Sequence, residues 1–123
     1  MIYGIGVDIA KVARFSRWVK EPGMVGRFFN QNEIRPFSSL QVACEHYAAR
    51  FAAKEAFGKA LGTGIFCFEL KDIYITHDEA GRPLLNVQGK ARKILENKCK
   101  NAKIHVSLSH EKEYATAFVV IEC

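Results

Sequence analysis

The sequence lacks the features that would place it in a membrane, on a secretory route or in a multidomain protein. Its 123 residues include only three prolines, too few for a proline-rich linker. No positively charged start leads into a long apolar run, and no stretch is long enough to span a bilayer. No linker, low-complexity tract or clear internal repeat interrupts the chain. We therefore expect one soluble, cytoplasmic domain over residues 1–123.

Cysteine is also scarce, and its spacing excludes a metal-binding or redox motif. The four cysteines are Cys44, Cys67, Cys99 and Cys123, and no two of them form a C-x-x-C pair. Such isolated residues are typical of reduced thiols in a cytosolic protein.

Positive charge, by contrast, is in excess. Eighteen Lys and Arg against thirteen Asp and Glu give a net charge of +5. Residues 11–35 hold six cations and two anions, a net charge of +4. Such a segment suits an acidic partner, whether nucleic acid, a phosphate-rich ligand, an anionic membrane or an acidic protein, but it is also consistent with a solvated helix face.

Residues 2–9 predict a strand that ends in a carboxylate. The two-residue period places Gly4, Gly6 and Asp8 on one face, opposite an apolar face. The apolar face consists of Tyr3, Ile5, Val7 and Ile9. Because glycine allows close approach, the gap beside Asp8 could admit a phosphate, a metal or another backbone; alternatively, Asp8 caps the next helix. The third glycine of a dinucleotide fingerprint is missing, which argues against a Rossmann fold.

A short amphipathic helix is expected over residues 11–20, with apolar side chains at helical spacing and cations largely opposite. Glu21-Pro22-Gly23 ends it. Asn30, with Glu33 three residues later, predicts a capping box.

Residues 41–61 form the longest helical pattern, and Gly62 is a natural stop signal. Glu55 falls on the apolar stripe of this helix, where a carboxylate needs a partner, a proton or a metal. A plain i,i+4 ion pair with Lys59 would satisfy it. The turn over residues 61–64 is either an ordinary turn or a nest of backbone N–H groups for an anion.

The second half predicts an antiparallel sheet and one further helix. A strand over residues 70–77, a turn over 78–83 and a strand over 84–87 precede a helix whose stripe is Ala91, Ile94, Leu95 and Cys99. Strands over 103–109 and 114–121 follow. The last strand is apolar on both faces, which suggests cover by another subunit. The expected class is α+β, a small single domain with a mostly antiparallel sheet packed on helices.

His105, Ser107 and Ser109 share one face of the strand over residues 103–109, and His110 ends it. A Ser–His nucleophile pair is poorly supported, because no glycine-flanked serine elbow is present. A strand histidine of this kind is more often a hydrogen-bonded structural residue.

The order of several motifs is more specific than any one of them. G-I-G-V-D-I begins the chain, R-F-A-A-K-E-A-F-G-K-A-L-G-T-G lies in the middle, G-R-P stands near position 82, and H-V-S-L-S-H precedes a final Y-A-T-A strand. Over residues 1–122 this series resembles the holo-(acyl carrier protein) synthase family, the small bacterial 4′-phosphopantetheinyl transferases. The resemblance implies the phosphopantetheinyl transferase fold and a Mg²⁺-dependent transfer of 4′-phosphopantetheine from coenzyme A to a serine of apo acyl carrier protein, in support of fatty acid biosynthesis.

The resemblance also implies roles for individual residues. Asp8 and Glu55 would hold Mg²⁺ on the coenzyme A diphosphate, in the room left by the glycine face, and Lys59 would neutralise developing charge. His105 would be contributed to the site and is favoured over His110 as general base, although a carboxylate or a metal-bound water is also open. The family positions around the coenzyme are matched by Arg50, Phe51, Lys54, Lys59, Gly62, Thr63, Gly64 and His105.

The family pattern further implies a carrier-binding surface and a trimer with active sites between subunits. Arg14 matches the position that pairs with the acidic carrier helix, and Arg17 and Lys20 could assist. Lys11 departs from the glutamate that many relatives carry, which leaves the carrier preference open.

Two rival functions belong to other classes. A basic nucleic-acid-binding module would need aromatic and basic residues interleaved on a strand, and these are missing. A non-catalytic coenzyme A or nucleotide sensor would bind without giving product. The expected partners are therefore coenzyme A and acyl carrier protein, with no nucleic acid and no membrane.

Overall fold

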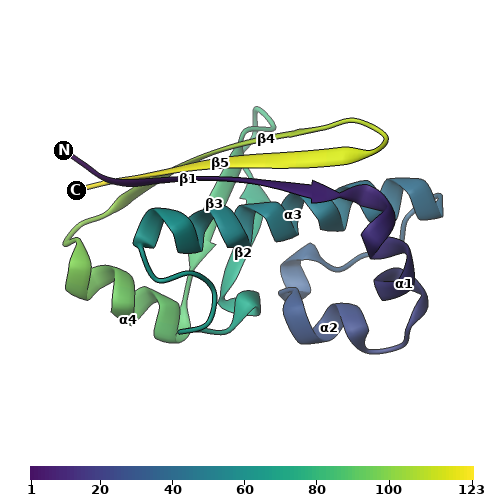
Figure 1. Ribbon diagram of the computed structural model, residues 1–123, viewed down its shortest axis with the longest axis horizontal. Coiled ribbons are helices and arrows are strands. Elements are labelled where there is room, and N and C mark those ends of the chain that lie inside the picture. Colours follow the sequence, from purple (N-terminus) through teal and green to yellow (C-terminus); the bar gives the residue numbers. More distant parts are fainter.

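The computed structural model describes all residues 1–123, arranged as a sheet covered on one face by helices (Figure 1). The sheet contains β1 (Ile2–Lys11), β5 (Tyr114–Glu122) and β4 (Lys103–His110), antiparallel and in that spatial order. The first strand therefore pairs with the last. The Met1 ammonium also donates to the Cys123 carbonyl at 2.9 Å, so the two ends of the chain lie side by side.

The long helix α3 (Leu40–Leu61) packs along the inner face of this sheet. It starts where the Ser39 hydroxyl accepts from the Val42 N–H, and it ends at Gly62 in the left-handed conformation, φ 86°. The alanines on its buried face leave little bulk between helix and strands, so the backbones come close. They are Ala48, Ala52, Ala56 and Ala60.

The segment after β1 differs from the prediction of one helix over residues 11–20. Strand pairing continues to Lys11 opposite Tyr114, a 3-10 turn, η1 (Val12–Arg14), follows, and α1 (Phe15–Lys20) is helical only from Phe15. Because β5 offers ladder partners to the end of β1, this tertiary pairing overrides the local helical pattern.

Two short elements complete the N-terminal half. They are α2 (Met24–Phe28) and a 3-10 turn, η2 (Gln31–Glu33). The predicted capping box of Asn30 and Glu33 is confirmed, and it caps η2.

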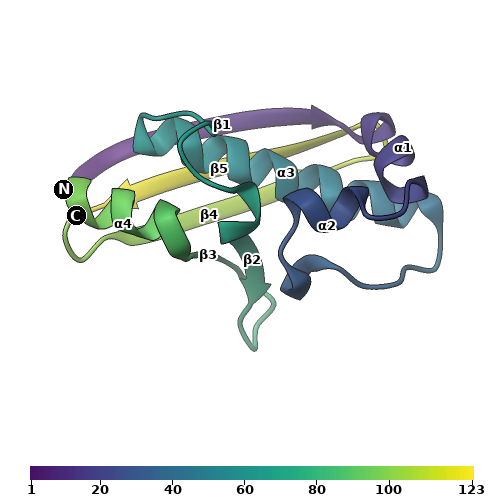
Figure 2. The ribbon, with the colours of Figure 1, turned by 90° about the horizontal axis from the view of Figure 1, so that it is seen from below.

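The second half follows the predicted order. After η3 (Leu70–Asp72), β2 (Ile73–His77) and β3 (Pro83–Val87) form a separate antiparallel hairpin, and α4 (Gly89–Lys98) leads into β4. Figure 2 shows α4 at the end of the sheet away from α1 and α2. The α+β class with an antiparallel sheet packed on helices is confirmed. None of the helices combines the length and apolarity that a membrane crossing requires.

The cysteines do not all follow the expectation of free thiols. Cys99, at the end of α4, forms a disulfide with Cys123, whereas Cys44 and Cys67 are free. The prediction for Cys99 and Cys123 was wrong because the pairing is between distant parts of the sequence, which no local spacing reveals. The antiparallel sheet brings the end of β5 beside the start of β4, and so beside Cys99.

Candidate functional site

Asp8 and Glu55 meet where β1 crosses α3. A Cβ on Gly4 would overlap the carbonyl oxygen of Ala60, and one on Gly6 would overlap that of Ala56. The glycine gap therefore admits the α3 backbone, and the prediction that it leaves room for a diphosphate was wrong. Its effect is to bring the strand close enough to α3 for the Asp8 carboxylate to influence that of Glu55.

Lys59 joins the two elements by hydrogen bonds to β1. Its Nζ donates to the Val7 carbonyl at 2.9 Å and to Asp8 Oδ1 at 3.3 Å. The predicted i,i+4 pair with Glu55 is absent, because Lys59 reaches across to the strand instead. Its side chain remains 53% exposed and that of Asp8 18% exposed, so the pair lies at the surface and is open to a ligand.

The Glu55 carboxyl has a raised pKa. Partial burial is the largest cause and the nearby Asp8 carboxylate is the second, while Lys59 and Arg14 act in the opposite direction. Two carboxylates held together at a partly buried position favour a bound cation, which would relieve both effects. Hard carboxylate oxygens are the donors that Mg²⁺ prefers. No group of three or more His, Cys, Asp or Glu side chains is placed to hold a metal, so a cation here would take only two protein ligands.

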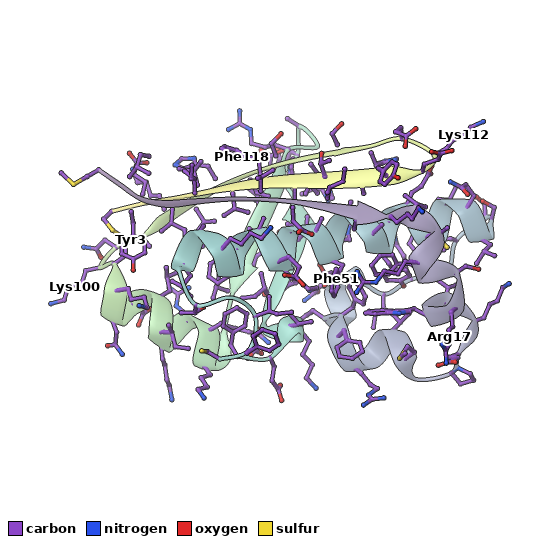
Figure 3. All side chains as sticks on the ribbon, viewed as in Figure 1. Tyr3, Arg17, Phe51, Lys100, Lys112 and Phe118 are labelled. Atoms are coloured by element: carbon purple, nitrogen blue, oxygen red, sulfur yellow. A yellow bond between two sulfur atoms is a disulfide. The ribbon has the colours of Figure 1, made fainter.

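Arg14 lies beside this acidic pair on an aromatic platform. Its guanidinium carbon is 4.9 Å from the centre of the Phe51 ring and also lies over Trp18. Phe51 is buried against Phe15 and Trp18 below the sheet (Figure 3). The Phe51 ring therefore supports the Arg14 guanidinium, and its contact with a nucleotide stays a prediction.

Lys54 points to the opposite side of α3 and is sealed in the core. Its Nζ donates to Glu33 Oε1 at 2.7 Å and to the carbonyls of Leu70 and Ile73. Both charged side chains are at most 1% exposed. Burial lowers the Lys54 pKa, and Glu33 counteracts this. Because three protein acceptors take up the ammonium, we assign Lys54 a structural role in place of the predicted ligand contact.

Arg50 marks a second, basic region on α3. Its side chain is buried, and its Nε has no hydrogen-bond partner. Burial lowers the Arg50 pKa, and Arg35 adds to this effect. His77 is also close enough for Arg50 and Arg35 to lower its pKa. A buried guanidinium nitrogen without an acceptor, next to further cations, is suited to an anion.

His46 belongs to the same region and is uncharged. Burial lowers its pKa to about 3, with a further contribution from Arg50. Its Nε2 lies 2.6 Å from the Glu33 carbonyl and its Nδ1 3.5 Å from Arg35 Nη2, so the neutral ring donates to the first and accepts from the second. Sequence reasoning missed Arg35, His46 and His77; only the i,i+4 spacing of His46 and Arg50 on one helix gave a signal.

The turn after α3 is an ordinary helix cap. The amides of Gly62, Thr63 and Gly64 all donate to the Gly58 carbonyl, at 3.0 to 3.1 Å. Because these N–H groups are already used, the alternative of an anion-binding nest is wrong for these three amides. A Cβ on Gly58 would collide with Gly64, which explains a glycine inside the helix.

His105 lies on the other face of the sheet. In β4 it stands opposite Val120 of β5, which pairs in turn with Ile5 of β1, and all three point away from α3. His105 Nε2 is 3.0 Å from Glu122 Oε1, an interaction that lowers the Glu122 pKa. Within one chain, His105 is therefore separated by the sheet from the Asp8–Glu55 pair.

The outer sheet face that carries His105 is strongly apolar. Figure 3 shows Phe118 on this side. Its exposed apolar residues are Ile5, Val7, Ile9 and Phe118, with exposed fractions from 44% to 62%. Tyr3 does not share this face as predicted, because the pairing of β1 with β5 shifts between Ile2 and Gly4, and Figure 3 shows Tyr3 on the other side of the strands. Contiguous exposed apolar surface of this kind is typical of a protein interface.

The remaining predicted residues lie at the surface of α1. Arg17 forms an exposed ion pair with Glu21, and Lys20 is exposed at the end of the helix. Together with Arg14 they give α1 a cationic surface next to the acidic pair.

Comparison with known proteins gives one consistent family. Residues 4–119 match the family model ACPS, the 4′-phosphopantetheinyl transferase superfamily. The chain is 48% identical over 123 residues to a holo-[acyl-carrier-protein] synthase of Treponema denticola, and the match covers 99% of both chains.

Solved structures give the same result. The holo-[acyl-carrier-protein] synthase of Neisseria meningitidis matches with a TM-score of 0.86 and 35% identity over 100% of both chains. The ACPS–CoA complex of Chronobacterium ammoniagenes matches with a TM-score of 0.82 and 28% identity, covering 97% of this chain and 96% of the other.

Proposed function

Because the chain belongs to the holo-(acyl carrier protein) synthase family of 4′-phosphopantetheinyl transferases, and is therefore an enzyme, we propose that it transfers 4′-phosphopantetheine from coenzyme A to a serine hydroxyl of apo acyl carrier protein. The products are holo carrier and 3′,5′-ADP. This reaction would supply carrier to fatty acid biosynthesis in the cytoplasm.

The observation that carries the proposal is the junction of Asp8, Glu55 and Lys59. Two carboxylates and an ammonium meet at an accessible position, and they come from a strand and a helix locked together at Gly4 and Gly6. This donor set fits Mg²⁺, which binds through one or two carboxylates and completes its shell with water and substrate phosphate. When bound, Mg²⁺ would neutralise charge on the diphosphate of coenzyme A.

The chain's own residues position the reaction and stabilise its charge. Lys59 is held at Asp8 with an exposed ammonium that can donate to the diphosphate. Arg14, over Phe51, adds a second cation on the carrier side. Phosphoryl transfer asks little more of the protein, because it depends mainly on alignment and on neutralising the developing charge.

The nucleotide end of coenzyme A carries a further phosphate, which the basic region around Arg50 would receive. The unpartnered Arg50 Nε and the nearby Arg35 support this assignment. We also retain the Gly62–Gly64 turn as a contact for the coenzyme, through atoms other than its three capped amides.

The general base is assigned to His105 of a neighbouring subunit. The apolar outer face supports a trimer, and the same face carries His105 on the side of the sheet away from Asp8. An interface formed by this face would deliver His105 to the site of the next subunit. His105 would then accept the serine proton or position the donor phosphate.

The carrier would dock on α1. Arg14, Arg17 and Lys20 face an acidic recognition helix there, and electrostatic attraction would accelerate the encounter. This surface lies next to the Asp8–Glu55 pair, so a docked carrier can present its serine to the reacting phosphate.

The test is the intact mass of apo acyl carrier protein after incubation with this protein, coenzyme A and Mg²⁺. A gain of one phosphopantetheine, lost in the presence of a chelator, is expected. Asp8→Ala and Glu55→Ala should each abolish the gain while the protein stays folded. No gain with several apo carriers, although coenzyme A binds, would identify a sensor in place of a transferase.

A further inference from the structure

A second cluster of positive charge lies at α4 and the segment that leads into β4. Residues 89–103 contain six cations and one anion, a net charge of +5, which equals that of the whole chain. The cations are Lys90, Arg92, Lys93, Lys98, Lys100 and Lys103, and all six are exposed. We call these six residues the α4 basic face.

The α4 basic face is hardly compensated within the chain. Arg92 pairs with Glu96 at 3.0 Å, and no other cation of the face has an acidic partner within ion-pair distance. Like charges so close together repel one another in the isolated protein. An anionic partner would relieve this repulsion, and its binding would be strongest at low ionic strength.

The face borders an amphipathic groove. A cavity of about 760 Å³ opens between α4, β3 and β4. Leu85, Val87 and Leu95 form its buried apolar floor, and the partly exposed Ala102 and Ile104 extend the apolar surface. Arg92 and Lys100 line it as cations, and Glu96 is the one acid of the lining. This combination fits an acidic helix that also presents an apolar side chain. It suits nucleic acid less well, because Tyr74 is the only aromatic residue of the lining and is half-buried.

The face is remote from the surfaces described above. Figure 3 shows Lys100 and Arg17 near opposite ends of the molecule. The helix α4 also lies on the inner side of the sheet, so a trimer built on the outer face would leave it free. Cys99, between Lys98 and Lys100, is tied to Cys123, which anchors this segment to the end of β5.

We propose that the α4 basic face and its groove form a second docking surface for acyl carrier protein, distinct from α1. The inference rests on the proposed function, which supplies an acidic partner with an amphipathic recognition helix. Figure 2 shows α4 at the opposite end of the molecule from α1, so a carrier held here is not on the surface that presents its serine to the Asp8–Glu55 pair. The positive field of the face attracts carrier to the enzyme, and carrier released from α4 increases the rate of encounter with α1.

The test is a titration of fluorescently labelled apo carrier with the intact protein at about 50 mM salt, where charges are weakly screened. The wild type is expected to bind two carriers per chain. Lys93→Glu/Lys100→Glu should remove one of them, and Arg14→Ala/Arg17→Ala should remove the other. Arg82→Glu, which reverses an exposed cation in the β2–β3 turn, is the matched control and should leave both.

Three results would overturn the inference. They are one carrier per chain in the wild type, unchanged binding by Lys93→Glu/Lys100→Glu, and binding of labelled duplex DNA rather than carrier at α4. Lys93→Gln/Lys100→Gln serves as the milder variant if charge reversal unfolds the protein. Transfer is measured separately by carrier mass: wild type that binds two carriers without modifying them would refute the proposed transfer and leave the docking surface standing.

Discussion

Two lysines on the same helix, five residues apart, form ion pairs of opposite character. Lys54 donates to Glu33 and to two carbonyls in the core, and both partners are at most 1% exposed. Lys59 donates to Asp8 and to Val7 at the surface, where half of its side chain is open to water. The first pair has no capacity left for a ligand, whereas the second has.

This difference shows why a motif alone misassigns residues. In F-A-A-K-E-A-F-G-K, both lysines lie within four residues of Glu55, but α3 turns them to different sides. Lys54 fixes the helix to η2 and β2, and Lys59 fixes it to β1. The sealed pair therefore contributes to the stability of the fold, and the open pair is available for chemistry.

The largest expected effect comes from breaking the sealed pair. Lys54→Met would leave the Glu33 carboxylate buried without its cation, and removal of one partner of such a pair costs about 3–5 kcal/mol of unfolding free energy. Urea denaturation measures this. Lys54→Met/Glu33→Gln should recover part of the loss, because no uncompensated charge remains. A stable Lys54→Met protein that no longer binds coenzyme A would instead make Lys54 a ligand contact.

Breaking the Asp8–Lys59 pair should lower activity strongly and stability only slightly. Lys59→Met is expected to lower kcat/KM for transfer about 100-fold, as for loss of one charge-stabilising group. Its unfolding free energy should change by less than about 1 kcal/mol, because the pair is exposed. Transfer kinetics and urea denaturation of the same preparation test both statements. Equal losses in activity and in stability would remove the distinction between the two lysines.

The effect of Glu55 on stability should depend on pH. Its folded pKa is raised, so its ionised form opposes folding as the pH rises above its ordinary value of 4.5. Glu55→Gln should therefore stabilise the metal-free protein at pH 7, by no more than about 1 kcal/mol because the carboxyl is only partly buried. The gain should vanish below pH 4, and transfer should be lost. Melting temperatures between pH 4 and 8 give the answer; a lower melting temperature at pH 7 would contradict the prediction.

The smallest effect is expected at α1. Arg17→Ala breaks an exposed ion pair, so stability should change by less than about 0.5 kcal/mol. The KM for carrier should rise a few-fold at low salt and return to the wild-type value at high salt, where charges are screened. The KM for coenzyme A serves as the control. A salt-independent change would exclude an electrostatic role for Arg17.

Local patterns predicted much of the fold. Gly62 ends α3 as predicted, the apolar stripe of residues 91–99 marks α4, and the two-residue alternation places Asp8 on the same face of β1 as Gly4 and Gly6. These features depend on neighbours in sequence. The end of the helix at Gly62 could be read because glycine tolerates the left-handed conformation that a helix stop requires.

Features that depend on distant segments could not be predicted. The continuation of β1 to Lys11 requires the β5 edge, and the Cys99–Cys123 bond requires the closed sheet. The sealing of Lys54 requires η2 and β2 to meet on one side of α3. Within the site, the Asp8–Lys59 contact depends in the same way on the packing of β1 against α3.

The pairing of β1 with β5 also constrains how the site can form during synthesis. Asp8 stands opposite Ala117, so its strand acquires its only sheet partner more than a hundred residues later. Contacts of such long sequence separation close slowly, because the loop entropy is lost before the pairing is gained. On the ribosome, α3 could form early, but Asp8 would stay unplaced until β5 had emerged. We therefore expect the paired carboxylates to be among the last parts of the molecule to assemble.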